Sequence, residues 1–252
     1  FVEISYVGYA SISFSIEANG DLSQDYALTP SILESNEVVV TGVSMATEIR
    51  RSPVPLSLIK QQELSRAMTT NLVDLIAHEP GVAQVSTGPA IAKPVIRGLG
   101  FNRVVVLNDG IRQEGQQWGD EHGLEVDEYS VKKVEVLKGP SSVMYGSDAL
   151  AGVLQVITNT PVPQGTLRGS FTGQYQSNNR FKASGLQLGG YGLKGFNWNV
   201  YGSLKMAGDY TNRYDGRVYN SRFNEHNGGG YLGWNGIWGH SHFIFSSYNQ
   251  EA

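Results

Sequence analysis

The residues of this chain best suited to bind a metal lie together in one polar segment, residues 113–123. Its sequence, QEGQQWGDEHG, places Asp120, Glu121 and His122 side by side. Carboxylate oxygens and an imidazole nitrogen are suitable ligands for a divalent metal or for haem iron. Adjacent residues rarely hold one ion without help. Such a site therefore needs a further ligand from elsewhere in the chain, and the adjacent Glu225 and His226 are the candidates.

The same segment also suits an organic chelate. Trp118 has a ring that can stack on a flat ligand, and Gln116 and Gln117 have amides that can form hydrogen bonds with it. The third interpretation is that this segment is a solvated polar loop that binds no ligand. The sequence leaves these three possibilities open.

The remaining histidines are weaker candidates for ligands. His240 and His242 share one face of an expected strand, because side chains two positions apart on a strand point the same way. His78 lies at the end of an expected helix, where an imidazole can interact with the negative end of the helix dipole. We expect structural roles for these three residues.

Signatures of catalysis and of nucleic-acid binding are missing. The sequence has no G-x-S-x-G, no H-E-x-x-H and no Walker motif. A G-x-G pattern begins at Gly98, but Arg103 stands where its third glycine should be. The 19 basic and 23 acidic residues give a net charge of −4 without a basic run, and there is no cysteine. We therefore expect neither an enzyme nor a nucleic-acid binder.

The clearest folding pattern lies in residues 131–160. Two runs rich in β-branched residues, 134–137 and 153–157, predict buried strands. Pro140 suits the first turn of a helix between them, and Gly146 suits its end. The segment therefore predicts a compact strand, short helix and strand.

Three motifs in this part of the chain resemble one known family. The segment 134–158, VEVLKGPSSVMYGSDALAGVLQVIT, closely resembles the end of the plug domain of TonB-dependent outer-membrane transporters. The segments 94–98, PVIRG, and 103–112, RVVVLNDGIR, resemble earlier plug motifs of the same family, in the same order. Three ordered motifs are a more specific signal than one short match.

The resemblance assigns roles to particular residues. It places the loop 113–123 at the plug apex, where the family captures substrate from outside. The substrate-binding residues it implies are Gln116, Gln117, Trp118, Asp120, Glu121 and His122. It also implies contacts between plug and barrel by Arg97, Arg103, Glu135 and Lys138. The family often has Arg where Lys138 stands, and Lys cannot make the same two-pronged bond.

The beginning of the chain also resembles parts of such transporters. Residues 1–35 contain two alternating strands, and ISYVGY resembles the end of a carboxypeptidase-regulatory-like β-sandwich, as in Bacteroidetes transporters; a plain hairpin is the alternative. Because Phe1 already lies inside an alternating strand, we expect the natural chain to begin upstream. Residues 36–42 resemble the TonB box, which can add itself as a strand to a sheet edge of TonB. The box residues are Glu37, Val38, Val39, Val40, Thr41 and Gly42.

The fold we expect is an α+β plug domain, residues 43–162, inside a transmembrane antiparallel β-barrel that begins at residue 163. In the plug, Asn71 and Asp74 predict the start of a helix that ends before Pro80. The barrel part, 163–252, shows period-two alternation of apolar and polar residues, the pattern of a membrane β-strand. Its expected strands are 166–176, 180–191, 196–207, 228–236 and 240–250.

The connections between these strands predict their orientation. Residues 192–195 and 237–239 form short turns, whereas 208–227 form a long polar link. Outer-membrane barrels have short periplasmic turns and longer outside loops, so we expect the long link outside and His240 and His242 lining the lumen. A barrel that encloses a plug needs about 22 strands, so most of its strands are not in this sequence.

These observations predict a TonB-dependent transporter in the outer membrane of a Gram-negative bacterium, with its plug and N-terminus reaching the periplasm. We expect its substrate to be a metal, haem or a metal chelate such as a siderophore or cobalamin, and no required cofactor. Its expected partners are TonB with its inner-membrane energising complex, and outer-membrane lipid. A glycan or peptide importer with a surface lipoprotein partner, and a passive receptor or adhesin, are the alternatives.

Overall fold

The computed structural model describes most of the chain after residue 55. The described residues are 2–4, 12–14, 26–27, 38–39, 47–48, 56–117, 122–158, 162, 164–192, 194–236 and 239–251. The chain forms two compact units, Phe1–Ser52 and Pro53–Ala252.

The first unit contains two short antiparallel strand pairs. Strand β1 (Val2–Ile4) pairs with β2 (Ile12–Phe14), as the alternating pattern predicts. Strand β3 (Val38–Val39) pairs with β4 (Thr47–Glu48). The β-sandwich remnant and the domain boundaries at 35 and 162 stay predictions.

The plug is built on a five-stranded mixed sheet in the order β10-β9-β12-β11-β5. Its outer strands are β5 (Leu56–Lys60) and β10 (Ile111–Gln113). Its central strands are β9 (Val104–Asn108), β11 (Lys133–Lys138) and β12 (Gly152–Ile157). Strands β9 and β12 run parallel, and the other neighbours are antiparallel. Valines and leucines of β9, β11 and β12 are almost fully buried, so the predicted β-branched runs form the plug core.

A smaller sheet and two short helices pack on this core. The smaller sheet consists of β6 (Val82–Ser86), β7 (Ala92–Ile96) and β8 (Leu99–Gly100). The helices are α1 (Gln61–Arg66) and α2 (Leu72–Ile76). As predicted, the Asn71 side chain caps α2, because its oxygen accepts a hydrogen bond of 2.9 Å from the Asp74 N–H. Within the described residues, no helix is long and apolar enough to cross a membrane.

Between β11 and β12 the chain forms tighter turns than predicted. Instead of an α-helix, Pro140–Tyr145 and Ser147–Ala149 form two 3₁₀ turns, η4 and η5. Gly146 separates them with φ +100°, a conformation that only glycine adopts without strain. Two further 3₁₀ turns, η2 (Phe101–Arg103) and η3 (Gly115–Gln117), flank β9 and β10.

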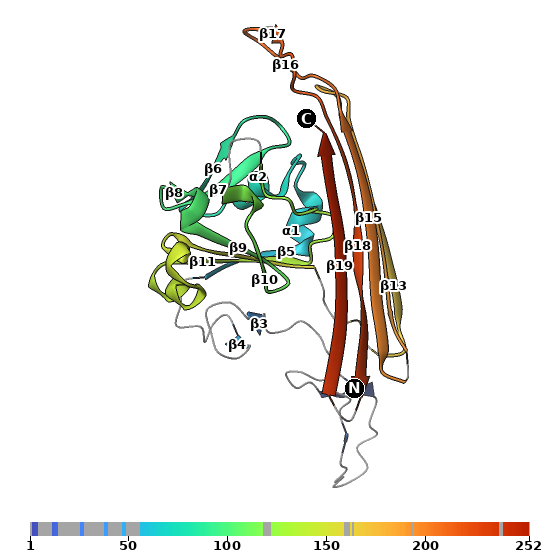
Figure 1. Ribbon diagram of the computed structural model, residues 1–252. Helices are drawn as coiled ribbons and strands as arrows, with labels where there is room; N and C mark the ends of the chain where they lie inside the picture. Colours follow the sequence, from blue (N-terminus) through green and yellow to red (C-terminus); the bar gives the residue numbers. More distant parts are fainter. Residues whose placement is uncertain are drawn as a thin grey trace. The chain divides into compact units, whose positions relative to one another are not determined.

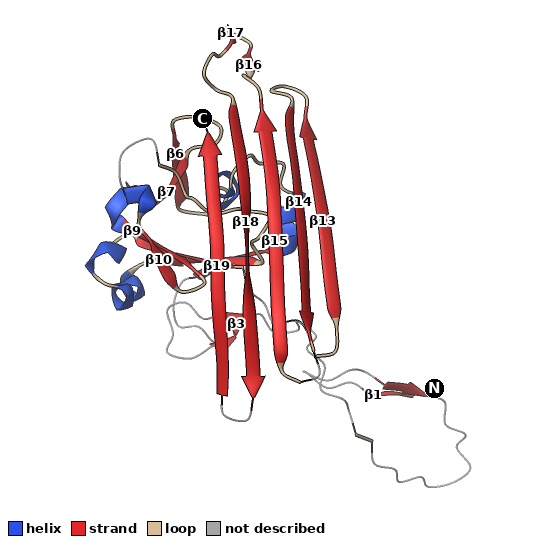
Figure 2. Cartoon of the chain, turned by 45° about the vertical axis from the view of Figure 1, so that its right-hand side comes forward, coloured by secondary structure: helices blue, strands red, loops and turns tan. Residues whose placement is uncertain are grey.

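The C-terminal part forms a second sheet of five long antiparallel strands, here called the barrel sheet (Figures 1 and 2). In spatial order its strands are β13 (Leu167–Gln176), β14 (Phe181–Tyr191), β15 (Phe196–Ala207), β18 (Phe223–Gly236) and β19 (Gly239–Glu251). All five predicted strands are confirmed. One boundary is wrong: β18 begins at Phe223 rather than at residue 228, so the long link is 208–222, with the small pair β16 (Thr211–Asn212) and β17 (Gly216–Arg217).

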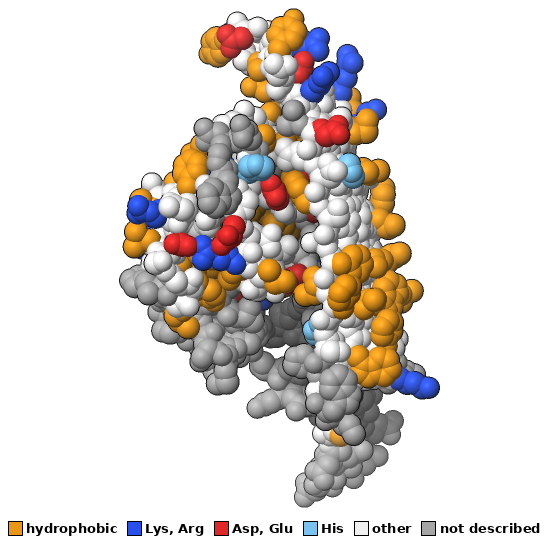
Figure 3. Space-filling model, in the orientation of Figure 1, with side chains coloured by type: hydrophobic (Ala, Val, Ile, Leu, Met, Phe, Trp, Pro, Cys, Tyr) orange, Lys and Arg blue, Asp and Glu red, His pale blue; other side chains and the backbone are white. Residues whose placement is uncertain are grey.

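The two faces of the barrel sheet differ in chemistry. On β15, Val200, Leu204 and Met206 are exposed, whereas the alternate residues Ser203 and Lys205 are buried. The exposed face continues across the sheet and is seen on the side of the strands away from the plug (Figure 3). Its large side chains include Leu167, Phe171, Tyr175, Leu186, Leu188, Phe196, Leu232, Trp234, Phe243 and Phe245. Such an apolar face suits contact with lipid, and the polar face is turned to the plug.

Candidate functional site

The plug touches the barrel sheet through the segment that leads into β11. Residues 127–130 end in a tight turn before this strand, and the turn presents Asp127, Glu128 and Tyr129 to the polar face of the sheet. Opposite them stand Lys205 on β15 and Glu225 on β18, which are direct neighbours in the strand register. We call Asp127, Glu128, Lys205 and Glu225 the interface cluster.

Lys205 lies at the centre of the interface cluster. Its side chain is 1% exposed, and its Nζ is 2.8 Å from Glu225 Oε1. The same ammonium group forms an ion pair with Glu128 of the plug. It also lies 5.7 Å from the centre of the Tyr129 ring. One buried cation therefore joins an acidic residue of the plug to an acidic residue of the sheet.

Tyr129 adds a packing contact beside this ion pair. The Tyr129 Cβ would lie 2.8 Å from a Cβ built on Gly185 of β14, which is closer than two such atoms can approach. Only glycine allows the plug to approach this closely. The Tyr129 hydroxyl donates a hydrogen bond of 3.1 Å to Gln174 Oε1 on β13, and Lys132 donates to Gln187 on β14. This part of the plug thus contacts three neighbouring strands, β13, β14 and β15.

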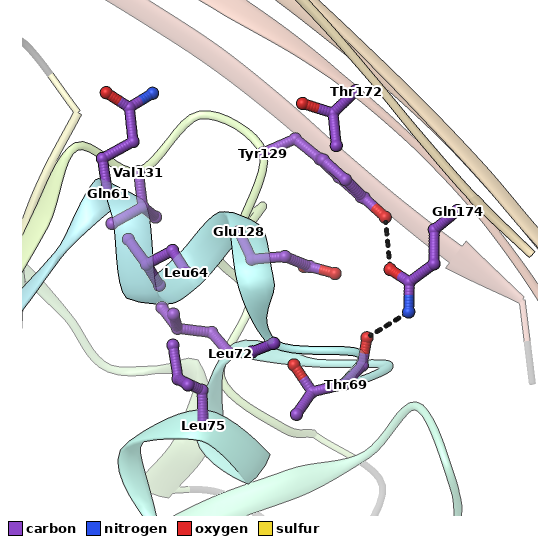
Figure 4. A pocket seen from close by; sticks show the side chains of 11 residues that line it. Gln61, Leu64, Thr69, Leu72, Leu75, Glu128, Tyr129, Val131, Thr172 and Gln174 are labelled. Atoms are coloured by element: carbon purple, nitrogen blue, oxygen red, sulfur yellow. Dashed lines mark hydrogen bonds between the residues drawn. The ribbon is translucent and has the colours of Figure 1, made fainter.

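A small cavity of about 50 Å³ lies between the plug helices and β13, next to this turn. Figure 4 shows Leu64, Leu72 and Leu75 on one side and Thr172 and Gln174 on the other, with Glu128 between them. The amide of Gln174 also donates to the Thr69 carbonyl at 3.4 Å. A cavity of this size has room for a few water molecules, and Glu128 is a polar partner for them.

Burial shifts the pKa values of the acidic residues of the plug turn. Loss of hydration raises the pKa of Glu128 to about 7, an effect that Lys205 opposes. Burial also raises the pKa of Asp127, again against the attraction of Lys205. The neighbouring carboxylates add a smaller effect in the same direction: Asp127 and Glu225 also raise the pKa of Glu128, so full ionisation of the cluster is costly.

The structure describes only part of the predicted apex site. Trp118, Asp120 and Glu121 lie outside the described residues, as does the side chain of Gln116. Gln117 lies in η3, and its amide nitrogen is buried without a described partner. His122 is exposed, and its Nδ1 is 3.2 Å from Glu125 Oε1. The apex site therefore stays a prediction.

The structure corrects the position of His226. We expected this residue in an outside loop, but it lies within β18. Its side chain is exposed, whereas its neighbours Glu225 and Asn227 are buried against the plug. Since adjacent residues of a strand point to opposite faces, His226 points away from the plug. His242, by contrast, lies on the plug side, where its ring packs edge-on against Tyr231 with centroids 5.9 Å apart.

Three of the four predicted plug charges have neighbours inside the plug. Lys138 Nζ donates to Ser57 Oγ at 2.9 Å and to the Pro80 carbonyl at 2.6 Å. The fully buried Glu135 pairs with Lys133 at 2.9 Å. The guanidinium of Arg97 lies against Gly139, and Arg103 is exposed in η2. Their contacts with a barrel wall stay a prediction.

Sequence reasoning missed the interface cluster. Lys205 is the only charged residue on the polar face of the expected strand 196–207. This signal could have identified it as a residue that pairs with an acidic group of the plug. Glu225 was not visible as its partner, because the stretch before residue 228 was assigned to a loop. The acidic pair Asp127 and Glu128 lies just before the expected strand 134–137, and no sequence pattern marked it.

Comparison with known proteins agrees with this arrangement. Residues 48–153 match the family model of the TonB-dependent Receptor Plug Domain. They form the plug domain of a TonB-dependent receptor. The barrel sheet that follows is part of the transmembrane β-barrel of this family, and the outer membrane of a Gram-negative bacterium is its location.

Within the aligned segments, curated relatives are about one third identical to this chain. The chain is 34% identical over 128 residues to the iron-regulated outer membrane virulence protein of Vibrio cholerae serotype O1, covering 48% of the chain and 20% of that protein. It is 30% identical over 137 residues to the vitamin B12 transporter BtuB of Vibrio vulnificus, covering 54% and 22%. It is also 30% identical over 125 residues to the hemin receptor of Yersinia enterocolitica, covering 49% and 18%. The chain thus spans about one fifth of the length of these relatives.

Solved structures share its fold. The siderophore receptor PirA from Pseudomonas aeruginosa superposes with a TM-score of 0.59 at 24% identity, covering 79% of this chain and 36% of that one. The copper transporter OprC superposes with a TM-score of 0.63 at 19% identity, covering 80% and 31%. At these identities the likeness establishes the fold alone, a plug and part of its barrel.

Proposed function

We propose that this receptor imports a metal, haem or a metal chelate across the outer membrane, and that TonB supplies the energy. The supporting observation is the plug held against the polar face of the barrel sheet by a buried ion pair. In a complete barrel a plug in this position would block the lumen, so that a substrate could pass only when the plug is displaced. The substrate class is supported by the curated relatives, whose names refer to iron, vitamin B12 and hemin.

The outside link 208–222 supplies a surface for capture. Arg213, Tyr214, Arg217 and Tyr219 are exposed there, and the Arg217 guanidinium lies 5.2 Å from the centre of the Tyr219 ring. Cations and aromatic rings together suit a flat, anionic ligand such as a metal chelate. Within the link, Arg217 also pairs with Asp209 at 2.9 Å, which steadies the β17 end of the loop. In this mechanism the substrate is moved and not chemically changed, so the protein is not an enzyme.

Transport by this mechanism must depend on TonB. In a strain that has the full-length receptor as its sole importer, accumulation of labelled ferric chelate, haem or cobalamin should fall to background when TonB is removed. The measurement is cell-associated label under metal limitation. Equal accumulation with and without TonB would identify a passive receptor instead, and accumulation of a glycan or peptide alone would favour the importer with a surface lipoprotein partner.

The apex loop should contribute to binding of the substrate. The double change Asp120→Ala/His122→Ala is expected to weaken metal or chelate binding to purified receptor at least about tenfold, because ligands to a metal contribute strongly to affinity. Binding is measured by titration calorimetry. The matched control is His78→Ala, which removes an exposed imidazole from another part of the plug. Unchanged affinity in the double variant would remove the apex loop from the site.

A further inference from the structure

The interface cluster holds more negative than positive charge. Asp127, Glu128 and Glu225 bring three carboxylates together, and Lys205 is the ammonium group that pairs with two of them. Asp127 is 4% exposed and Glu225 is also 4% exposed, so solvent screens them little. When all four groups are ionised, two negative charges in the cluster have no counter-charge from Lys205. Buried charges of one sign are costly unless something neutralises them.

The free oxygens of the cluster show where a neutralising group would bind. Within the described part of the chain, Asp127 Oδ2 and Glu128 Oε1 are buried and have no hydrogen-bond partner. Asp127 Oδ1 accepts from the Tyr129 N–H at 3.2 Å, and Glu128 Oε2 pairs with Lys205. Glu225 Oε1 accepts from Lys205 and, at 2.6 Å, from the Asn227 amide. Unpartnered buried carboxylate oxygens are rare, and a bound ion or water is one of the ways in which proteins satisfy them.

The spacing of the three carboxylates fits one cation. One oxygen from each of Asp127, Glu128 and Glu225 lies within 4.8 Å of the other two. Ca²⁺ binds oxygen at about 2.3–2.6 Å, so two of its ligands on opposite sides are separated by about 5 Å. Mg²⁺ has shorter bonds of about 2.0–2.1 Å and keeps several of its waters. All three oxygens can therefore reach one ion, and Ca²⁺ is favoured because Mg²⁺ gives up its waters reluctantly and is seldom held by protein oxygens alone.

We propose that the interface cluster binds one divalent cation of the size of Ca²⁺, held by Asp127 and Glu128 of the plug and by Glu225 of β18. One such ion together with Lys205 balances the three carboxylates. Its ligands are hard oxygens, as Ca²⁺ prefers, and the Ser203 hydroxyl and water from the adjacent cavity can complete its coordination. The ion would join the plug to the barrel sheet, so its presence would strengthen the contact that must break when the plug moves.

Binding of Ca²⁺ to purified full-length receptor tests this proposal. After treatment with a chelator, the protein in detergent is titrated with Ca²⁺ by calorimetry, and with Tb³⁺, whose luminescence is excited through nearby tyrosines. We expect one site that Asp127→Asn and Glu225→Gln each weaken at least about tenfold, because each removes a charged ligand. The matched control is Glu251→Gln, which removes an exposed carboxylate at the end of β19. Wild-type binding equal to that of both variants, or no binding by the folded wild type, would overturn the proposal.

A second variant separates ion binding from damage to the fold. Lys205→Met removes a positive charge next to the proposed ion, so it should bind Ca²⁺ more tightly than the wild type. Its thermal unfolding temperature should also rise more on addition of Ca²⁺ than that of the wild type. Weaker binding by a folded Lys205→Met protein would contradict the proposal. Neither measurement involves transport, so a negative result would leave the proposed function unaffected.

Discussion

Deletion of residues 37–42 is expected to leave substrate binding intact and to abolish uptake. Binding depends on the apex and the outside loops, whereas uptake requires a pull on the plug from the periplasm. A short β-branched segment can pair by its backbone with a sheet edge of TonB, which transmits force with little side-chain recognition. Among the described residues Val38–Val39 pair with Thr47–Glu48, whereas Glu37, Val40, Thr41 and Gly42 lie outside the described part of the chain.

The experiment compares two deletions of equal length in the full-length receptor. Removal of 37–42 should reduce the accumulation of labelled substrate to the level of cells without TonB, with an unchanged dissociation constant on whole cells. Removal of the polar stretch 19–24 should leave both quantities near their wild-type values. Normal uptake by the 37–42 deletion would show that this segment does not couple the receptor to TonB.

Replacement of Lys205 by Met should loosen the plug where it meets the barrel sheet. The substitution leaves Glu128 and Glu225 buried without their cation, and breaking a buried ion pair in this way costs about 3–5 kcal/mol. In buffer with a chelator, amide hydrogen exchange in residues 127–131 should accelerate by about 100-fold or more, since local opening then needs that much less free energy. Mass spectrometry of peptides from this segment measures the change.

The barrel sheet offers a matched control for this substitution. Lys182 on β14 stands directly opposite Met206 on β15 and points to the exposed face, so Lys182→Met removes the same group from the other side of the sheet. It should leave exchange in 127–131 unchanged. The triple change Lys205→Met/Glu128→Gln/Glu225→Gln should recover much of the loss, because it removes the uncompensated charges too. Similar exchange in Lys205→Met and Lys182→Met would show that the ion pair does not hold the plug.

The fold could be predicted from the sequence where one physical pattern dominated. Leu204 and Met206 alternate with Ser203 and Lys205 because one face meets lipid and the other the plug, and this alternation gave every strand of the barrel sheet. The start of β18 was missed because Asn224, Glu225, His226 and Asn227 are all polar. At this end of the strand the exposed face is polar as well, so the alternation disappears while the backbone pairing with β15 continues.

The site was predicted less completely than the fold. Motif resemblance identified the plug and pointed to an apex loop, because those features are local in sequence. The interface cluster joins Glu128 to residues 77 and 97 positions later, Lys205 and Glu225, and no local pattern reports such a contact. Gly185 was also unremarkable in the sequence, although its missing side chain admits Tyr129.

The position of the plug is tested most directly by a reversible cross-link between Tyr129 and Gly185. This chain has no cysteine, so Tyr129→Cys/Gly185→Cys introduces a single pair into it. The two Cβ positions are close enough for a disulfide after a small shift. In a full-length receptor otherwise free of cysteine, we predict that mild oxidation of whole cells forms this bond. The bond should stop uptake without reducing substrate binding, and its reduction should restore uptake. Failure of the bond to form in folded receptor, or full uptake while it is intact, would contradict a plug that rests against the barrel and must move for transport.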